Sequence, residues 1–435
     1  MHSDLRNSEY VSWRRFLQNS DAWNAQEIAE YQFRQLQRIL AHAYTNTIGY
    51  RQLFEDHGLH PDDLRAITDL TRFPFITKEL IRDQLHIFST TDTNRSYVTT
   101  GGSTGIPFGF YRNHTAFSRE LASKAHQYAR VGWREGDRQL VFRGLPVASP
   151  DHMQYVGDFE ELRCSSYHLT DEQMRTYYEA ALRYRPEWIR CYPSTGTIFA
   201  DFINTNNLRL DGIKGVLCAS ENLYDWQKGR LQEAFCARVF SHYGHYELAV
   251  LAGFCEYADT YHVLPQYGYA ELVAGNGQLV TTTGELGEIV ATSFLMTNTP
   301  FIRYRTRDFA VLDAWTCDKC ARPYQIWKKI EGRLQEFIVT GLGRYISMTA
   351  VNMHDETFEA IRQFQFFQEQ PGKLVLRYIP KITGSSTALS DLVARLRIKI
   401  GDDVEVELKQ VDEIALTGRG KHRFLVQMLP LRYGE

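Results

Sequence analysis

Four thiol and imidazole side chains in the second half of the chain are spaced as ligands of a metal ion. Cys317 and Cys320 are separated by two residues, a spacing at which two thiolates bind one tetrahedral zinc ion with Zn–S distances of about 2.3 Å. Cys255 and His262 lie upstream and would complete the four ligands if the fold brings the two pairs together. The sequence therefore predicts a zinc site, with buried thiols that bind no metal as the alternative.

A run of glycine and hydroxyl-bearing residues in the first quarter of the chain is suited to binding phosphate. It comprises Thr99, Thr100, Gly101, Gly102, Ser103, Thr104 and Gly105. The glycines permit close approach of the backbone to a ligand, and the hydroxyls and backbone N–H groups can surround phosphate oxygens. The run is not a Walker motif, because Ile106 stands where that motif needs lysine. Taken alone, such a run is most often an ordinary turn.

Five further segments combine aromatic and charged side chains with small residues. They are Ala219-Ser220-Glu221, Tyr243-Gly244-His245-Tyr246-Glu247, Tyr304-Arg305-Thr306-Arg307-Asp308, Gly332-Arg333 and Gly418-Arg419-Gly420-Lys421. Taken singly they have ordinary structural interpretations: Tyr243 as a core residue, Asp308 as a turn residue and Lys421 as part of an exposed basic loop. A function is indicated only by their occurrence together and in this order.

The elements expected to position these segments divide the chain into four parts. Roughly the first 90 residues are expected to be mainly helical, since apolar residues recur at helical spacing over Asn24–Thr45 and Thr77 is a candidate N-cap. From about 95 to 245, strand-like and helix-like runs alternate, which predicts a largely parallel sheet with ligands at the carboxyl ends of its strands. Short β-like segments follow, among them Gln278–Thr282, and the last hundred or so residues predict a small α+β unit.

These patterns predict an α/β protein of two domains. A large multi-subdomain N-terminal domain over residues 1–335 would contain a helical start, a parallel-sheet α/β core and an antiparallel β subdomain at about 262–335. A small C-terminal α+β domain would follow over residues 336–435.

The composition limits the class of protein. With 49 Lys and Arg against 52 Asp and Glu the net charge is −3, which argues against a broad cationic surface for nucleic acid. No apolar run of about 18 residues is present, so membrane insertion is not expected. The N-terminus, MHSDLRNSEYVSWRRF, has no apolar h-region, so no secretory signal is expected either. Seven cysteines, an odd number, do not suggest a disulfide framework and favour a reducing, cytoplasmic compartment. Four of them are expected to be small core residues: Cys164, Cys191, Cys218 and Cys236.

Together, the motifs resemble those of the adenylate-forming (ANL) superfamily, and within it the phenylacetate–CoA ligase branch that includes the CapK-like proteins of polysaccharide loci. The resemblance covers roughly residues 70–430. It rests on the loop at 99–107 that ends in Gly-x-Pro, the Tyr-Gly-x-x-Glu segment at 243–247 and Tyr-Arg-Thr-Arg-Asp at 304–308. Arg307, where many superfamily members have glycine, is typical of this branch.

The resemblance implies that the motifs bind Mg·ATP. The loop Thr99–Gly105 would wrap the β- and γ-phosphates, and Glu247 would hold Mg²⁺, a cation that prefers carboxylate and phosphate oxygens. Tyr243 would offer an aromatic face to the adenine, and Asp308 would accept hydrogen bonds from the ribose hydroxyls. The other residues implied to line the nucleotide pocket are Ser220, Glu221, Gly244 and Arg333.

The resemblance also implies a mobile C-terminal domain. Lys421 would reach between the substrate carboxylate and the α-phosphate, where its charge offsets the charge that builds on the attacked phosphoryl group. The domain would then rotate about Gly332–Glu336 and withdraw Lys421. Leu334-Gln335-Glu336 departs from the acidic pair that is more usual in the family, which leaves Glu336 as the hinge residue. Members of this branch can also carry a structural zinc at positions matching the four Cys and His ligands.

The implied activity is ATP-dependent activation of a small carboxylic acid to acyl-AMP, followed by transfer of the acyl group, most often to coenzyme A. An amine or amino sugar is the alternative acceptor, because CapK-like relatives are associated with surface-polysaccharide synthesis. An alternative of another class is a catalytically silent nucleotide-binding scaffold, since a fold does not determine a function. The sequence leaves the acid, the acceptor and a homodimer open.

Overall fold

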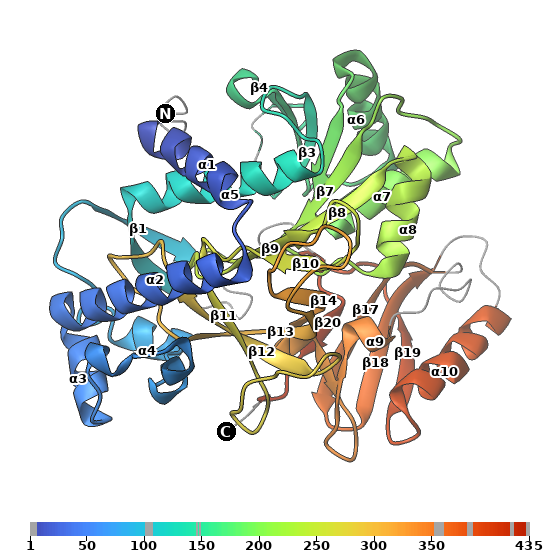
Figure 1. The fold of residues 1–435 in the computed structure, drawn as a ribbon. Coiled ribbons are helices and arrows are strands. Elements are labelled where there is room, and N and C mark those ends of the chain that lie inside the picture. The colour runs from blue at the N-terminus through green and yellow to red at the C-terminus, as the bar shows by residue number, and fades with distance from the viewer. Residues whose placement is uncertain are drawn as a thin grey trace. The chain divides into compact units, whose positions relative to one another are not determined.

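The computed structural model describes residues 7–100, 108–144, 147, 149–351, 361–380, 386–417 and 422–431 of the chain (Figure 1). The chain folds into two compact units, each built from two separate stretches of sequence. The first unit is Met1–Asp137 with Phe240–Ile330, and the second is Arg138–Val239 with Glu331–Glu435. Within the described residues, no helix combines the length and the apolarity that crossing a membrane requires.

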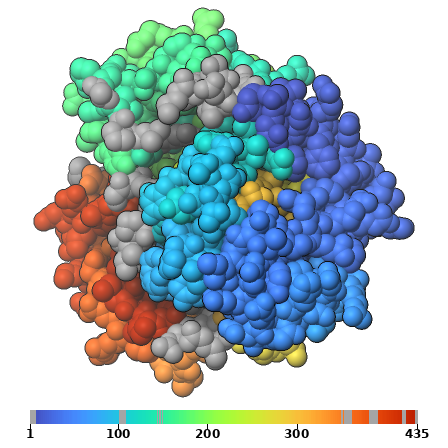
Figure 2. Space-filling view, turned by 90° about the vertical axis from the view of Figure 1, so that its left-hand side faces the viewer, coloured from blue at the N-terminus to red at the C-terminus, as the bar shows by residue number. Residues whose placement is uncertain are grey.

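The first unit begins with helices, as the apolar periodicity predicts. They are α1 (Ser8–Ser20), α2 (Ala25–Asn46), α3 (Ile48–Asp56) and α4 (Lys78–Asp83), with 3-10 turns at Pro61–Asp63 and Ile67–Arg72. A capping box between Asn24 and Glu27 begins α2. Thr77 is the N-cap of α4, as predicted, and its hydroxyl accepts a hydrogen bond from the N–H of Leu80. Figure 2 shows these helices in blue, next to the segment that follows them in cyan.

An antiparallel hairpin flanks the glycine-rich run. Strand β1 (Arg95–Thr100) pairs with β2 (Phe108–Asn113), and the register places Thr100 opposite Phe108. The run at 101–107 is therefore the connection between the adjacent ends of these two strands. Helix α5 (His114–Arg130) follows β2 directly.

The predicted β subdomain forms the remainder of the first unit. Its strands lie in the order β11, β12, β13, β14, β10, β9, β8. Their bounds are β8 (Arg238–Gly244), β9 (Leu251–Phe254), β10 (Tyr261–Val263), β11 (Gly268–Val273), β12 (Leu286–Ser293), β13 (Tyr304–Ala314) and β14 (Ile326–Arg333). The strand expected at Gln278–Thr282 is wrong. Only Val280 in that segment is buried, and its pairing is one isolated bridge between Leu279 and Val273, so it lacks the apolar face that would hold it as a strand.

The second unit contains the predicted parallel sheet. Strands β7, β6, β3 and β5 are parallel neighbours, and β4 pairs antiparallel with β5 at the edge. The elements are β3 (Gln139–Arg143), β4 (Met153–Val156), β5 (Glu161–Ser165), α6 (Asp171–Tyr184), β6 (Trp188–Cys191), α7 (Pro193–Thr205), β7 (Gly215–Ala219) and α8 (Asp225–Phe235), with a 3-10 turn at Gly157–Phe159. The alternation of strands and helices over this stretch confirms the expected βα organisation.

The C-terminal stretch forms a four-stranded sheet in the order β19, β18, β17, β20. Its elements are a 3-10 turn (Leu334–Glu336), β15 (Phe337–Val339), β16 (Tyr345–Ser347), α9 (Met348–Val351), β17 (Ile361–Gln370), β18 (Lys373–Pro380), α10 (Ser386–Ile400), β19 (Glu405–Gln410) and β20 (Leu425–Gln427). Strands β17 and β18 form the expected hairpin, whose turn includes Gly372 at a φ of +75°, a conformation that favours glycine. The predicted α+β character of this stretch is confirmed.

Three of the four cysteines expected in the core are buried there: Cys164, Cys191 and Cys218. The expectation for Cys236 is wrong, because this residue is exposed. It is the C-cap of α8, with a φ of +48°, and the left-handed conformation at a helix end turns the chain away from the core.

Candidate functional site

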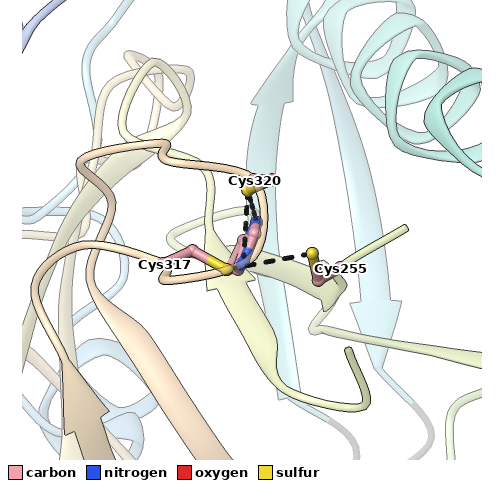
Figure 3. Close-up of side chains that lie close together, drawn as sticks. Cys255, Cys317 and Cys320 are labelled. Carbon is pink, nitrogen blue, oxygen red and sulfur yellow. Dashed lines mark hydrogen bonds between the residues drawn. The ribbon is translucent and has the colours of Figure 1, made fainter. Parts of the chain in front are cut away.

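The structure brings the four predicted metal ligands together. One ligand atom from each of Cys255, His262, Cys317 and Cys320 lies within 4.8 Å of the others. The sulfurs of Cys255 and Cys317 are 3.9 Å apart, and the sulfur of Cys320 is 4.0 Å from the ring nitrogens of His262 (Figure 3). A tetrahedral site with Zn–S bonds of about 2.3 Å has S···S edges of about 3.8 Å. The sulfurs of Cys255 and Cys317 are therefore spaced as one edge of such a site, and the other donor atoms lie close enough to share one ion.

Two structural features create this arrangement. Cys255 follows β9, and His262 lies on the neighbouring strand β10, where it is paired with Gly253. Cys317 and Cys320 lie in the connection between β13 and β14, in a tight turn closed by the N–H of Ala321 donating to the carbonyl of Cys317 at 2.9 Å. The strand pairing of the subdomain thus brings the two halves of the ligand set to the same place.

The chemistry of this pocket suits a soft metal ion. Cys255, His262 and Cys317 are buried, and Cys320 is partly exposed. Burial, helped by the nearby Arg130 and Arg322 charges, lowers the pKa of His262 to about 4, so the imidazole is neutral at physiological pH and can donate a lone pair. Three thiols and one imidazole form a donor set that zinc prefers, whereas Mg²⁺ and Ca²⁺ prefer oxygen. The residues present fit a structural zinc.

Tyr243 and Asp308 form one part of the candidate nucleotide site. They lie on β8 and β13, and the Tyr243 hydroxyl donates a hydrogen bond of 2.7 Å to Oδ2 of the buried Asp308. This bond fixes the orientation of both side chains. A carboxylate has about four acceptor positions, so accepting from Tyr243 does not exhaust its capacity to bind a diol.

Glu247 is held by two neighbours in the same unit. Oε2 lies 3.1 Å from Nδ1 of His245, and Oε1 accepts a hydrogen bond of 3.1 Å from the hydroxyl of Tyr304. Burial alone would raise the pKa of Glu247, but the hydrogen bond and the charge of His245, together with the bond from Tyr304, lower it to about 2. The carboxylate is therefore ionised at neutral pH, the state that a cation ligand requires.

The arginines of the segment at 304–308 pair with acidic side chains. Arg305 binds Oε2 of the buried Glu288 through Nε and Nη2 at 2.9 and 2.6 Å. Arg307 adopts a φ of +62°, and its N–H donates to Oε1 of the same glutamate at 3.1 Å. Its guanidinium lies 3.0 Å from Glu79. These contacts hold the segment in a turned backbone conformation, one that glycine adopts more easily than arginine.

Three further residues that the sequence predicts to line the nucleotide pocket lie in the second unit: Ser220, Glu221 and Arg333. Ser220, just after β7, has a φ of +70°. Glu221 accepts two hydrogen bonds of 3.0 Å from Ser194, one from the backbone N–H and one from the hydroxyl. Glu221 therefore caps the first turn of α7 as well as following the parallel strand β7. Arg333, at the end of β14, is exposed and follows Gly332, whose φ is +90°.

Several predicted residues are described only partly or not at all. Thr99 is exposed on β1, and the backbone of Thr100 ends that strand. Gly244 is exposed at the end of β8. The loop residues Gly101, Gly102, Ser103, Thr104 and Gly105, and also Lys421, lie outside the described residues.

Three contacts of the predicted site residues were not anticipated from the sequence. His245 and Tyr304 hold Glu247, and Ser194 engages Glu221. His245 had a signal, because it stands two residues from Glu247 within the same motif. Tyr304 stands in the motif that contains Asp308, but nothing in the sequence pairs it with Glu247. Ser194 had no signal. Each meets its partner across more than 25 residues of sequence through strand and helix packing.

Comparisons with known proteins agree with these features. A family model described as the CapK C-terminal domain matches residues 338–428. The phenylacetate-coenzyme A ligase of Pseudomonas putida is 27% identical over 337 residues, 75% of this chain and 75% of that protein. Protein CapK of Staphylococcus aureus is 22% identical over 414 residues, 92% of this chain and 89% of that protein.

The fold also matches a solved structure over nearly its whole length. The crystal structure of 2-hydroxyisobutyryl-CoA ligase, in the postadenylation state with R3-HIB-AMP, aligns with a TM-score of 0.76 at 19% identity and covers 94% of this chain and 91% of that chain. The predicted fold class and the resemblance inferred from the motifs are confirmed.

Proposed function

We propose, from the premise that this chain is an adenylate-forming ligase related to the phenylacetate–CoA ligases and to CapK, that it activates a small carboxylic acid as acyl-AMP and transfers the acyl group to coenzyme A. The observation that carries the proposal is the pair of buried carboxylates, Glu247 and Asp308, each held by a tyrosine hydroxyl. Glu247 is ionised at neutral pH, as a ligand of a cation must be, and Asp308 is oriented by Tyr243 to accept hydrogen bonds from a diol.

The first half-reaction needs positioning and charge neutralisation more than a protein nucleophile. The substrate carboxylate would attack the α-phosphorus of ATP, forming a C–O–P linkage and releasing pyrophosphate. Asp308, oriented by Tyr243, would bind the ribose hydroxyls, with the Tyr243 ring against the adenine. Glu247 would hold Mg²⁺, which, when bound, offsets charge on the phosphate oxygens. In the same proposal Thr99–Gly105 surrounds the β- and γ-phosphates and Arg333 lies near the ribose.

The second half-reaction needs a different arrangement of the C-terminal stretch. Lys421 would stabilise acyl-AMP formation and then be withdrawn by rotation about Gly332–Glu336, so that a thiol can attack the acyl carbon and release AMP. Gly332 supports the hinge assignment, because its φ of +90° is accessible to glycine and strained for other residues. A Cβ at this position would also lie 2.0 Å from Oε2 of Glu336.

We further propose that Cys255, His262, Cys317 and Cys320 bind one structural zinc ion. The support is the mutual distance of the donor atoms and their soft chemistry. The ion would join β9 and β10 to the turn between β13 and β14, away from the sequence segments proposed to bind the nucleotide. It would stabilise the fold and take no part in the reaction.

An amine or amino-sugar acceptor is the second candidate. The observation that favours it is the family-model match at 338–428, which is to CapK and covers the stretch that would admit the acceptor. The acid-activating step is the same in both proposals, so only the nucleophile differs.

A pyrophosphate-release screen over a panel of aromatic and aliphatic acids tests these proposals. Each acid is assayed with no acceptor, with coenzyme A and with amino sugars, and Asp308→Ala serves as the inactive control. Release that depends on acid and rises with coenzyme A supports the ligase, and a rise with an amino sugar instead supports amide formation. Nucleotide binding without release for any acid would favour a silent scaffold and contradict both.

A further inference from the structure

One ring nitrogen of His245 is buried but has no hydrogen-bond partner. The side chain of His245 is 9% exposed, and its Nδ1 lies 3.1 Å from Oε2 of Glu247. Its Nε2 is also buried, and no polar atom of the described residues lies within hydrogen-bonding distance of it. Buried polar atoms are nearly always paired in folded proteins, because an unpaired one has lost its contacts with water and gained none in return. Nε2 therefore indicates a partner that comes from a ligand.

The backbone and Glu247 together fix the position of this ring. Strand β8 ends at Gly244, and His245 begins a turn in which its carbonyl accepts a hydrogen bond of 3.2 Å from the N–H of Leu248. Leu248 is buried and has a φ of +52°. The contact between Nδ1 and Glu247 sets the rotation of the ring about its bond to the chain. The ring is thus held with Nε2 in the interior.

His245 lies beside the residues that orient the two buried carboxylates. Its ring centroid is 6.2 Å from that of Tyr243, which donates to Asp308, and 6.1 Å from that of Tyr304, which donates to Glu247. The two nitrogens of an imidazole point in roughly opposite directions, so Nε2 points away from Glu247 and from a cation bound there. The contacts proposed for Mg·ATP therefore leave Nε2 to another group.

A hydroxyl group is the partner that fits Nε2. A hydroxyl both donates and accepts, so it pairs with this nitrogen whether or not the nitrogen carries a proton. An alkyl group does neither. Two substrates of the proposed reaction can present a hydroxyl: the ribose of ATP and the acid. The ribose hydroxyls are assigned to Asp308, which Tyr243 already orients. The acid must lie close to the α-phosphate that it attacks, and it is therefore the source of the hydroxyl.

We propose that His245 is a specificity-determining residue whose Nε2 binds a hydroxyl group of the acid, and that this protein activates a hydroxylated carboxylic acid. The inference rests on the proposed function, because it names the class of acid that would be converted to acyl-AMP. The hydroxyl is bound and does not react, so the covalent steps of the proposed function are unchanged.

The first test compares acids that differ only in the hydroxyl. Pyrophosphate release is measured with each hydroxybenzoic acid against the methylbenzoic acid of the same ring position, and with lactic acid against isobutyric acid. A methyl group has nearly the size of a hydroxyl but leaves Nε2 unpaired. The wild type should therefore favour the hydroxyl member of at least one pair by at least about tenfold in kcat/KM. Activity without such a preference in any pair would overturn the inference.

The second test assigns the preference to Nε2. His245→Asn keeps an amide near the position of Nδ1, where it can donate to Glu247, but has no atom at the position of Nε2. His245→Gln places its amide near the position of Nε2. The preference should fall by at least about tenfold in the asparagine variant and be partly kept in the glutamine variant. Because the preference is a ratio measured on one variant, a general loss of activity through Glu247 cancels.

His242→Asn is the matched control for this test. His242 lies on β8, three residues before His245, and its Nδ1 is 3.0 Å from the hydroxyl of Tyr128. This variant should keep the preference. Equal loss of the preference in His242→Asn and His245→Asn would indicate a structural effect and contradict the assignment.

The third test separates the acid from the ribose as the source of the hydroxyl. Calorimetric titrations compare ATP with 2′-deoxy-ATP and 3′-deoxy-ATP, in the wild type and in His245→Asn. The loss of affinity on removing a ribose hydroxyl should be the same in both proteins, within about twofold. A loss that disappears in His245→Asn would assign Nε2 to the ribose and refute its assignment to the acid.

The outcomes distinguish this inference from the proposed function. Pyrophosphate release that depends on an acid but shows no preference for a hydroxyl overturns the inference and leaves the function standing. A preference that persists unchanged in His245→Asn shows that another residue recognises the hydroxyl, and it overturns the role of His245. Nucleotide binding without release for any acid contradicts the proposed function and the inference together.

Discussion

Each carboxylate proposed to bind Mg·ATP receives a hydrogen bond from a tyrosine of the same unit: Tyr243 donates to Asp308, and Tyr304 donates to Glu247. Such bonds orient an acid before it meets its ligand, which lowers the cost of ordering on binding. At the residue scale, the site therefore consists of acid–phenol pairs, and each pair can be dissected by removing either the acid or only the hydroxyl.

We expect Asp308→Ala to weaken ATP binding by at least about tenfold, since a hydrogen bond to a charged group contributes about 1.5–3 kcal/mol. Tyr243→Phe keeps the ring and should cost less, on the order of 1 kcal/mol. Glu247→Gln should reduce Mg²⁺-dependent adenylation. Calorimetric ATP titration with and without Mg²⁺ measures these effects, and Asp313→Ala on the same strand, β13, is the control. Wild-type behaviour of both acid variants would refute the nucleotide assignment.

Acid stability should depend on Glu247. Its pKa is lowered from 4.5 to about 2 in the folded protein, so the stabilisation is present above pH 4.5 and is lost as the pH falls toward 2. Melting temperatures of the wild type should therefore fall over this range, and those of Glu247→Gln should fall less steeply, because the amide has no proton to gain. Parallel curves for the two proteins from pH 5 to pH 2.5 would contradict the assignment.

Arg307 holds a left-handed backbone conformation that costs a non-glycine residue on the order of 1–3 kcal/mol. Its ion pair with Glu79 joins two exposed groups and contributes little, about 0–1 kcal/mol. Arg307→Gly should therefore leave the free energy of unfolding unchanged or raise it, whereas Arg307→Ala, which keeps the strain and loses the pair, should lower it. Urea unfolding of the two variants measures the difference. A glycine variant less stable than the alanine variant would show that the left-handed conformation at this position is not a source of strain.

At the element scale, the turn between β13 and β14 connects the strand that carries Tyr304 and Asp308 to the strand that contains Gly332, the glycine of the proposed hinge. Cys317 and Cys320 lie in this turn, and their partners lie beside it on β10 and at the end of β9. Binding one ion at four positions would cross-link the end of β9, strand β10 and the turn between β13 and β14. A metal bound here would stabilise the arrangement of these strands, and it would take no part in the proposed reaction.

Purified protein should contain about one zinc ion per chain, and Cys317→Ser or Cys320→Ser should lose it and melt at a lower temperature. Cys236→Ser is the control, because Cys236 is an exposed cysteine at the end of α8. Metal analysis and thermal unfolding give the two readouts. Metal-free protein with unchanged melting in the cysteine variants would return these residues to ordinary buried thiols.

Elements with strong periodicity were predictable, and contacts between distant elements were not. Apolar spacing located α2 to within a residue or so, because one helical face must be buried. Gln278–Thr282 has a strand-like composition, but all of its side chains except that of Val280 are exposed in the fold. Composition alone could not predict this exposure. The Cys-x2-Cys spacing indicated half a metal site, whereas its completion depends on the pairing of β9 with β10. The burial of Tyr224 among residues 338–425 is likewise a tertiary effect.

At the scale of the whole molecule, each compact unit combines an early and a late stretch of the chain. The residues proposed to bind the nucleotide are divided between the units: Tyr243, Glu247 and Asp308 belong to the first, and Glu221 and Arg333 to the second. Lys421 belongs by sequence to the second unit as well. Such a division suits a reaction in two steps. A residue needed only in the first step can be moved away from the substrate in the second step, together with the stretch of chain that carries it.

Lys421→Ala should therefore affect only one half-reaction. Acyl-AMP formation should slow by well over tenfold, more than about 1.4 kcal/mol of transition-state stabilisation, with little change in ATP affinity. Transfer from synthetic acyl-AMP should continue at the wild-type rate. Single-turnover measurements from ATP and acid, and separately from acyl-AMP, test this, and Arg419→Ala controls for loss of any cation from that segment. Equal losses in both reactions would indicate a folding defect, and no loss in either would make Lys421 a solvated charge.

The burial of Tyr224 also affects how C-terminal segments can be exchanged between related proteins. Tyr224, at the start of α8, is buried in the core of the segment at 338–428 that matches the family model. The core of this segment therefore includes a residue from outside the matched sequence. Expressed without α8, it would lack a large buried side chain, a loss that in other cores costs about 3–5 kcal/mol. A chimera that receives this segment from a relative must therefore receive residues 224–226 of that relative with it. Otherwise the side chain at position 224 will not fit the core of the transferred segment. Successful transfer of the segment therefore depends on Tyr224 and Trp226, which lie more than a hundred residues upstream of it.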